Sequence, residues 1–423
     1  MKTALAESLP ASTALDKAVN SAVPVGPGLR VLKIAPTSFF ADYGCHVRIL
    51  EETLALQRMG QQVRICTYPT GRDLHGLDIR RAPGIPGLNS VRIGTSRRKP
   101  YLDILLTCRA LAEAARFRPD LVHAHLHDGA LIGYVVSRAC GIPLVFDFQG
   151  SMTSEMIDHG FLSRESRVYG PLRWLERKID HISDAIMTSS THAAELVINE
   201  FGCSSAKVHS VPDGVNTDTF RPRWEVDPAV IRMLRAKLGI PEGRRVVVYL
   251  GLLAEYQGAS HLLRAAAKLL QRQPNVHFLV MGYPGQERYR AAAAHLGILD
   301  HVTFTGALPY ELAPIYLPLG DVAISPKMSA TEGNGKLLNY MAVGLPTVAF
   351  DTPVNRELLG EAGAYAPLGD TEALSERLEE LLTNEDRAQG IGRALRVRAV
   401  ERYSWDRGCL RVLEVYRQVI GAR

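Results

Sequence analysis

Residues 326–351, PKMSATEGNGKLLNYMAVGLPTVAFD, combine a glycine-rich turn, a short helix and a buried strand in one run. Apolar residues recur at helical spacing from Leu337 onwards, and Pro346 follows the point where the helix should end. At residues 333–335 the turn would present unpaired backbone N–H groups and the positive end of the helix dipole to an anion. The turn therefore predicts a diphosphate cradle, with an ordinary loop in which Asn334 caps the helix as the alternative.

The composition is that of a soluble globular protein with two domains. The chain of 423 residues is too long for one core. Hydrophobic residues make up 46% of it and charged residues 22%, which supplies enough apolar side chains for two cores. The net charge of +5 is too small for a dedicated nucleic-acid-binding protein but suits an enzyme of anionic substrates. The six cysteines lack a close pair or a metal-ligand spacing, which predicts reduced thiols in a cytoplasmic protein.

Strands alternate with helices in both halves of the chain, which predicts two doubly wound α/β domains. Examples are the strand runs that start at Arg30 and Gln62 in the first half and at Arg245 in the second. Residues 1–28, rich in Ala, Ser and Pro, predict a disordered leader, and no apolar run is long enough to cross a bilayer. We expect a first domain at 29–220, a linker at 221–242, a second domain at 243–402 and a final segment at 403–423.

Three short motifs carry a family resemblance. They are Glu332-Gly333, the helix end Tyr340-Met-Ala-Val-Gly-Leu-Pro346, and Asp213-Gly-Val-Asn216, where Asn-Gly-Val-Asp is usual. Together they resemble the retaining glycosyltransferases of the GT-B fold, specifically family 4, whose members are called group 1. The resemblance implies two Rossmann-like domains facing a central cleft and a last helix that crosses back onto the first domain.

The resemblance also implies the reaction and the residues that perform it. A sugar would move from a nucleoside diphosphate sugar to an acceptor hydroxyl without a metal, another cofactor or a separate nucleophile, because the diphosphate receives the acceptor proton. The resemblance and the glycine turn together predict the site residues, which include the positions where this chain departs from the family: His125, Glu332 and Lys336 for catalysis; Gly44, Gly251, Gln257, Gly282, Gly333, Asn334, Gly335, Leu337 and Asn339 for the donor; and Asp128 and Gln149 for the acceptor.

The sequence departs from the family pattern at the donor site. Asn339 replaces a Glu that holds the ribose hydroxyls, although an amide can still bind a diol. Leu252 and Gln257 replace two cations that clamp the donor phosphates, and each such contact is worth roughly 1.5–3 kcal/mol. Lys336, at the mouth of the glycine turn, is the candidate substitute, with a solvent-facing helix residue as the alternative. Gln149 stands where the family commonly has His.

Three histidines alternate in the run PDLVHAHLH, so that His123, His125 and His127 would share one side of the sheet. A metal site would show this spacing, but strand-spaced histidines without an acidic partner more often line a polar cleft. In the family, the residue at the position of His125 reaches the reacting sugar. Asp128 follows, where the family makes acceptor contacts.

Arg92, Arg97, Arg98 and Lys99 precede an apolar run that starts at Tyr101. This pattern fits a membrane-surface contact as well as a core helix with a solvated basic start. We expect a retaining glycosyltransferase of glycan, lipopolysaccharide or glycolipid synthesis, cytoplasmic and peripheral on the membrane, with a glycan or lipid-linked acceptor. The alternative is a catalytically degenerate nucleotide-sugar-binding or partner subunit, because the two phosphate-clamping cations are missing.

Overall fold

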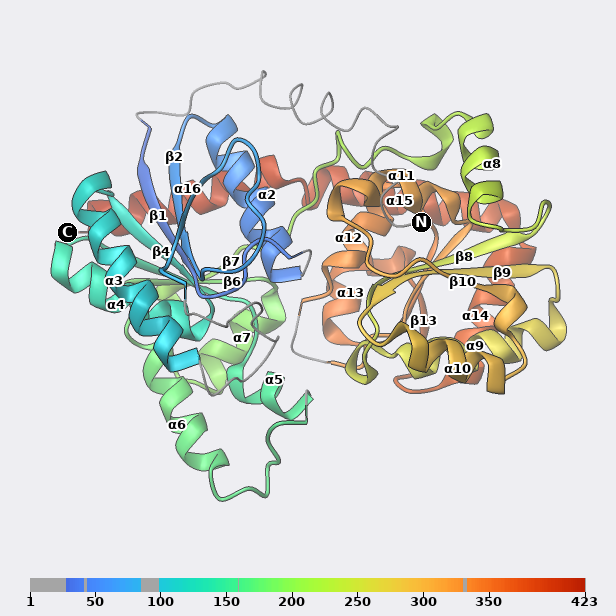
Figure 1. The fold of residues 1–423 in the computed structure, drawn as a ribbon, viewed down its shortest axis with the longest axis horizontal. Coiled ribbons are helices and arrows are strands. Elements are labelled where there is room, and N and C mark those ends of the chain that lie inside the picture. The colour runs from blue at the N-terminus through green and yellow to red at the C-terminus, as the bar shows by residue number, and fades with distance from the viewer. Residues whose placement is uncertain (1–27, 42–43, 85–98, 159, 330–332, 423) are drawn as a thin grey trace.

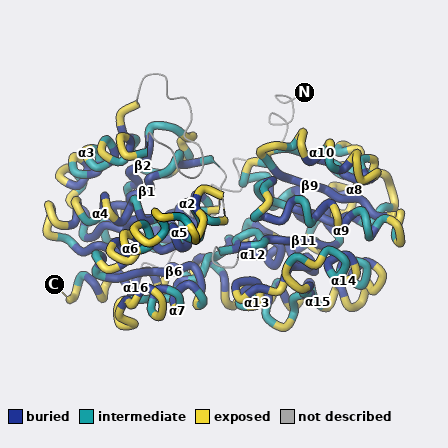
Figure 2. The backbone as a smooth tube through the Cα atoms, turned by 90° about the horizontal axis from the view of Figure 1, so that it is seen from below, coloured by how far each residue is buried: buried dark blue, intermediate teal, exposed yellow. Residues whose placement is uncertain are grey.

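The computed structural model describes residues 28–41, 44–84, 99–158, 160–329 and 333–422. In these ranges the chain forms two α/β domains side by side, each a parallel sheet with helices on both faces (Figure 1). Figure 2 shows buried strands running through the middle of each domain and exposed residues on the outer helices. The predicted fold class of two Rossmann-like domains is therefore confirmed.

A seven-stranded sheet forms the first domain, in the order β3-β2-β1-β4-β5-β6-β7. All recorded pairings in it are parallel. The central strands β4 and β5 are buried along their whole length, as expected for a parallel sheet covered on both faces. The strands are β1 (Arg30–Ala35), β2 (Gln62–Thr67), β3 (Asp78–Arg81), β4 (Leu121–His125), β5 (Leu144–Phe148), β6 (Ala185–Thr188) and β7 (Val208–Ser210).

Helices cover both faces of the first sheet because successive residues of its strands point to opposite sides. Along β1, Val31 packs in a core with α2 and the last helix α16, whereas Leu32 packs in another with α3 and α4. The helices are α2 (Gly44–Arg58), α3 (Lys99–Phe117), α4 (Leu126–Cys140), α5 (Met152–Asp158), α6 (Tyr169–Asp180), α7 (Thr191–Asn199) and α16 (Trp405–Gly421).

The second domain contains a six-stranded parallel sheet in the order β10-β9-β8-β11-β12-β13. Helices α8, α12, α13 and α15 contribute to the core on one face, and α9, α10 and α14 to the core on the other. The strands are β8 (Arg245–Leu252), β9 (Val276–Tyr283), β10 (Val302–Phe304), β11 (Val322–Ser325), β12 (Thr347–Phe350) and β13 (Ala364–Ala366). The helices are α8 (Pro228–Lys237), α9 (Ala259–Arg272), α10 (Gln286–His295), α11 (Ala313–Tyr316), α12 (Gly335–Ala342), α13 (Pro353–Leu359), α14 (Thr371–Thr383) and α15 (Glu385–Arg402).

The chain passes between the domains twice, and the two passages lie together. Val215 on the first passage forms a parallel bridge with Ser404 on the second. The segment 221–242, predicted as a linker, contains α8, whose Ile231 and Leu234 are buried in the second core. After the second passage, α16 packs on the first domain. None of the described helices is long and apolar enough to span a bilayer.

Candidate active site

A cleft of about 550 Å³ lies between the two domains, at the carboxyl ends of the strands of both sheets. From the first domain it is lined by the loop after β1 and the start of α2; from the second it is lined by the ends of β8 and β9 and by residues 333–335. Open α/β sheets bind ligands at this edge, because the turns after the strands and the helix N-termini converge there. The cleft is therefore the candidate active site.

The glycine turn of the second domain borders this cleft. Gly333, Asn334 and Gly335 all line it, and α12 starts at Gly335. The Asn334 side chain makes no capping hydrogen bond to α12. Instead its Nδ2 donates to Ser325 Oγ at 3.0 Å and to Asn355 Oδ1 at 2.8 Å. The turn is thus anchored to strand β11 and helix α13, and the start of α12 faces the cleft.

Two lysines stand beside the glycine turn. Lys336 Nζ donates to Gln257 Oε1 at 2.7 Å and lies 4.8 Å above the ring of Tyr249. Lys327 Nζ donates to the carbonyl oxygen of Gly333 at 2.6 Å. Both lysines line the cleft. Lys336 therefore reaches Gln257, the position at which the family pattern has one of its phosphate-binding cations, and Lys327 is a second cation that sequence reasoning missed.

Two glycines, at the ends of β8 and β9, occupy positions beside the cleft where a side chain would not fit. A Cβ on Gly282 would lie 2.4 Å from the carbonyl oxygen of Gly251, and a Cβ on Gly251 would lie 2.9 Å from Lys336 Nζ. Gly251 also has a φ of 148°, a conformation that favours glycine. A side chain at Gly251 would displace Lys336, and a side chain at Gly282 would collide with the backbone of β8, so both glycines are required for this packing.

The remaining predicted donor residues differ in where they lie. Gly44 starts α2 and Asn339 is on α12, and both line the cleft. Leu337 is fully buried in the core of the second domain and does not line the cleft. Glu332 falls outside the described residues.

The predicted acceptor residues Asp128 and Gln149 both line the first-domain side of the cleft. Asp128 forms an ion pair with Lys99 at the start of α3. Gln149 Nε2 donates to Asp147 Oδ2 at 2.8 Å, which fixes its amide at the end of β5. Of the predicted basic stretch, Arg92, Arg97 and Arg98 fall outside the described residues.

The structure places His125 below the cleft rather than in it. Its side chain is fully buried, and its Nδ1 lies 2.8 Å from Asp147 Oδ2. Burial lowers the pKa of His125 to about 4, so the ring is neutral near pH 7. The three histidines do not share one side, because β4 ends at His125 and Leu126, with a φ of 64°, turns the chain into α4. His127 lines the cleft instead.

His123, His125 and Asp147 bring one ligand atom each within 4.8 Å of one another, a grouping that could hold a metal ion. Several of their polar atoms already have other partners, although His123 Nε2 and His125 Nε2 have no hydrogen-bond partner among the described residues. Asp147 pairs with Arg48 at 2.8 Å, and His123 Nδ1 lies 2.6 Å from the Tyr416 hydroxyl. The guanidinium of Arg48 would also repel a cation, so this grouping fits a buried hydrogen-bond network better than a metal site.

Arg48 links the buried network to the cleft. Its Nη1 donates to Asp213 Oδ1 at 2.7 Å, and both residues line the cleft. Asp213 Oδ2 lies 3.0 Å from where a Cβ on Gly333 would be, so this carboxylate faces the glycine turn across the cleft. Burial raises the pKa of Asp213, although Arg48 opposes the shift. The exchange of acid and amide at residues 213–216 was the sequence signal for Asp213, whereas no sequence signal pointed to Arg48.

Two parallel α/β domains, with a cleft at the carboxyl ends of both sheets and a helix N-terminus opening into it, are the arrangement of the GT-B fold. Residues 43–214 match the family model of the glycosyl transferase 4-like domain, and residues 230–398 match that of the glycosyl transferases group 1. The chain belongs to the group 1 glycosyltransferases, as its motifs predicted.

Similar proteins support this assignment. The chain is 30% identical over 354 residues to the 2-deoxystreptamine glucosyltransferase of Streptomyces kanamyceticus. The matched region covers 77% of this chain and 87% of that protein. It is 28% identical over 404 residues to the D-inositol 3-phosphate glycosyltransferase of Acidothermus cellulolyticus, covering 90% and 86%. The solved structure of Anabaena HepE in complex with UDP and glucose shares the fold, with a TM-score of 0.74, 15% identity, and coverage of 92% and 100%.

Proposed function

We propose that this glycosyltransferase moves a sugar from a nucleoside diphosphate sugar to an acceptor hydroxyl with retention at the anomeric carbon. The carrying observation is the hydrogen bond from Lys336 Nζ to Gln257 Oε1, 2.7 Å long. It brings a positive charge to the position where the family pattern has a phosphate-binding cation and this chain has Gln257. Lys336, on α12, would thus bind the donor phosphates in place of the cation that is missing at position 257.

The proposed chemistry is the breaking of the bond between the anomeric carbon and the diphosphate oxygen. The acceptor oxygen would form its bond on the same face, and its proton would pass to the departing diphosphate. Backbone N–H groups at Gly333 and Gly335 and the charges of Lys336 and Lys327 would stabilise the charge that develops on that diphosphate. Glu332 would hold the sugar hydroxyls and Asn339 the ribose. This scheme requires neither a metal nor another cofactor.

On the acceptor side, Asp128 and Gln149 would bind hydroxyl groups of the incoming substrate. The two named relatives act on 2-deoxystreptamine and on D-inositol 3-phosphate, which are both polyhydroxylated six-membered rings. We propose an acceptor of this kind, free or as part of a glycan or lipid. His127, which lines the cleft, would contact the substrates, whereas the buried His125 would hold Asp147 and through it Gln149 in place.

A membrane-surface position belongs to the same proposal. On α3, Tyr101 is 67% exposed and Ile104 is 61% exposed, close to the basic Lys99. Apolar side chains next to a basic residue on a surface helix suit the interface of an anionic membrane. We propose that a lipid-linked acceptor would be reached from the cytoplasmic face of a membrane through this helix.

The alternative function is a catalytically degenerate nucleotide-sugar-binding or partner subunit. The observation that favours it is the absence of both family cations, with Leu252 and Gln257 in their places. Such a protein would still bind a nucleotide in the cleft. It would release no nucleoside diphosphate from any nucleotide sugar.

The test compares UDP, GDP and ADP binding to the wild type and to Lys336→Ala by calorimetry. We expect one nucleoside diphosphate to bind, and Lys336→Ala to weaken it by about ten- to a hundredfold, because one charge-assisted phosphate contact is lost. The corresponding nucleoside, which lacks phosphates, should bind both proteins equally. Lys237→Ala, an exposed lysine on α8, is the matched control and should leave binding unchanged.

Turnover separates the two functions. With the sugar of the nucleotide that binds, the wild type should release nucleoside diphosphate when 2-deoxystreptamine or inositol 3-phosphate is added, and Lys336→Ala should release it far more slowly. Binding without release from any donor and acceptor pair would favour the degenerate protein. If Lys336→Ala bound the diphosphate as tightly as the wild type, the proposed phosphate clamp would be wrong.

A further inference from the structure

A second cavity, of about 490 Å³, lies in the second domain away from the cleft. It is at the amino ends of the strands: Arg245 starts β8, Asp321 precedes β11, and residues 344–346 precede β12. Its other walls come from the 3-10 turn Arg223–Glu225, from α8 and from α15. The cleft is at the carboxyl ends of the same strands, so the sheet separates the two cavities.

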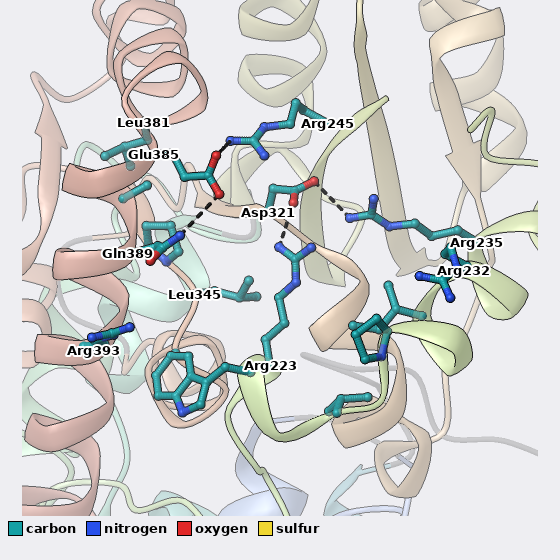
Figure 3. Close-up of a pocket in the computed structure, with 17 residues that line it drawn as sticks. Arg223, Arg232, Arg235, Arg245, Asp321, Leu345, Leu381, Glu385, Gln389 and Arg393 are labelled. Atoms are coloured by element: carbon teal, nitrogen blue, oxygen red, sulfur yellow. Dashed lines mark hydrogen bonds and ion pairs between the residues drawn. The ribbon is translucent and has the colours of Figure 1, made fainter. Parts of the chain in front are cut away.

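Positive charge predominates in this second cavity (Figure 3). Asp321 is shared by Arg223, at 2.7 Å, and Arg235, at 2.9 Å. Its pKa is lowered by these two arginines against the effect of burial. Asp321 and Glu385 are the two carboxylates of the lining. The five arginines that face them are Arg223, Arg232, Arg235, Arg245 and Arg393.

Several of these arginines lack a close carboxylate. In the part of the chain that the structure describes, Arg232 and Arg393 form no ion pair, and Figure 3 shows them on opposite sides of the cavity. Arg245 is 3.9 Å from Glu385, whose side chain is 65% exposed, so that pair is weak. The pKa of Arg235 is lowered, first by burial and also by the charges of Arg223 and Arg245. The cavity thus holds more positive charge than its own acids compensate.

The rest of the lining is apolar and aromatic. The lining includes Trp224, which is 54% exposed, together with Ile231 and Leu345. A volume of this size suits a small molecule with one ring, because ligand pockets span about 300–1,000 Å³. Guanidinium groups bind phosphate through paired hydrogen bonds and are more weakly hydrated than an ammonium group. In a ligand with a phosphate group attached to a ring, the phosphate would bind the arginines and the ring would pack on the apolar and aromatic residues.

We propose that this cavity binds a small phosphate ester of a ring compound, such as a sugar phosphate, with the phosphate between the arginines and the ring against Trp224. The site is distinct from the donor site and does not depend on the proposed reaction. It lies next to the first passage between the domains, because its lining residues Arg223 and Trp224 directly follow that passage. A ligand here would contact the end of this passage.

Calorimetry on the full chain with glucose 6-phosphate, orthophosphate and glucose tests the proposal. At about 0.15 M salt, which screens exposed charges, glucose 6-phosphate should bind more tightly than orthophosphate, and glucose should not bind. The double variant Arg232→Ala/Arg393→Ala should weaken glucose 6-phosphate binding by about tenfold or more. Both arginines are exposed, so the melting temperature should stay that of the wild type.

Three further variants separate this cavity from other anion sites. Trp224→Phe should weaken glucose 6-phosphate binding and leave orthophosphate binding unchanged. Lys336→Ala, in the cleft, and Arg407→Ala, an exposed arginine on α16, should leave both unchanged. The proposal would be overturned if the wild type did not bind glucose 6-phosphate, if the double variant bound it like the wild type, or if Lys336→Ala removed the binding.

Discussion

At the scale of single residues, the buried Glu51 on α2 should make the stability of the protein depend on pH. It is buried, bonded to the hydroxyl of Tyr310 in the second domain, and burial raises its pKa to about 7. The folded protein therefore keeps a proton that the unfolded chain releases from about pH 4.5 upwards, and stability falls as pH rises through this range. At about pH 8, Glu51→Gln should have a free energy of unfolding up to roughly 3 kcal/mol above that of the wild type, measured by urea denaturation. At about pH 4 the two proteins should not differ in this way. Glu195→Gln, on the surface of α7, is the control, and an equal effect of Glu51→Gln at both pH values would contradict the expectation.

At the scale of elements, the N-terminus of α7 is bound by an acid from the other domain. The Glu357 carboxylate on α13 accepts hydrogen bonds from the backbone N–H of Thr191, at 2.8 and 3.0 Å, and of His192, at 3.3 Å. A negative charge at this end of a helix stabilises it by about 0.3–1 kcal/mol at low ionic strength. Glu357→Gln should lower the free energy of unfolding by about this amount, and the difference should shrink as NaCl is added. Glu361→Gln, close by in sequence, should show no such salt-dependent loss; a loss for Glu357→Gln that salt leaves unchanged would exclude the charge as its cause.

At the scale of the whole molecule, the first domain depends on a helix from the other end of the chain. Seven side chains of α16 are buried, among them Trp405 and Tyr416, and they pack against the first sheet and α2. At about 1.5–3 kcal/mol for each buried large apolar side chain, removing α16 would cost about as much as the 5–15 kcal/mol that stabilise a whole domain. We therefore expect residues 28–222 alone to lack a cooperative unfolding transition by circular dichroism, and residues 28–222 joined through a flexible linker to 403–422 to regain it. Cooperative unfolding of the shorter fragment would show that α16 is dispensable.

The fold was predictable from the sequence because the strand runs and glycine motifs are local patterns. The candidate site was less so, since its charged partners are far apart in the chain: Arg48 and Asp213 are separated by 165 residues and no spacing rule connects them. The three histidines were expected on one side of the sheet because the period of two was extended past His125, the last residue of β4. Leu126 turns the chain there, so that His127 lines the cleft while His125 stays buried. Lys336 was found because it adjoins the glycine turn, but its contact with Gln257 depends on how the 3-10 turn Glu255–Gln257 packs against α12.

The return of α16 to the first domain also sets the order in which the protein can be completed during its synthesis. The last strand of the first sheet, β7, ends at Ser210, and α16 starts at Trp405. A ribosome adds about 5–20 residues per second, so the roughly 200 intervening residues take on the order of 10–40 s. Throughout this interval the face of the first sheet that α16 later covers has no permanent partner. The second domain can fold as soon as it emerges, whereas the nascent first domain must wait, and it would be the part that engages a chaperone.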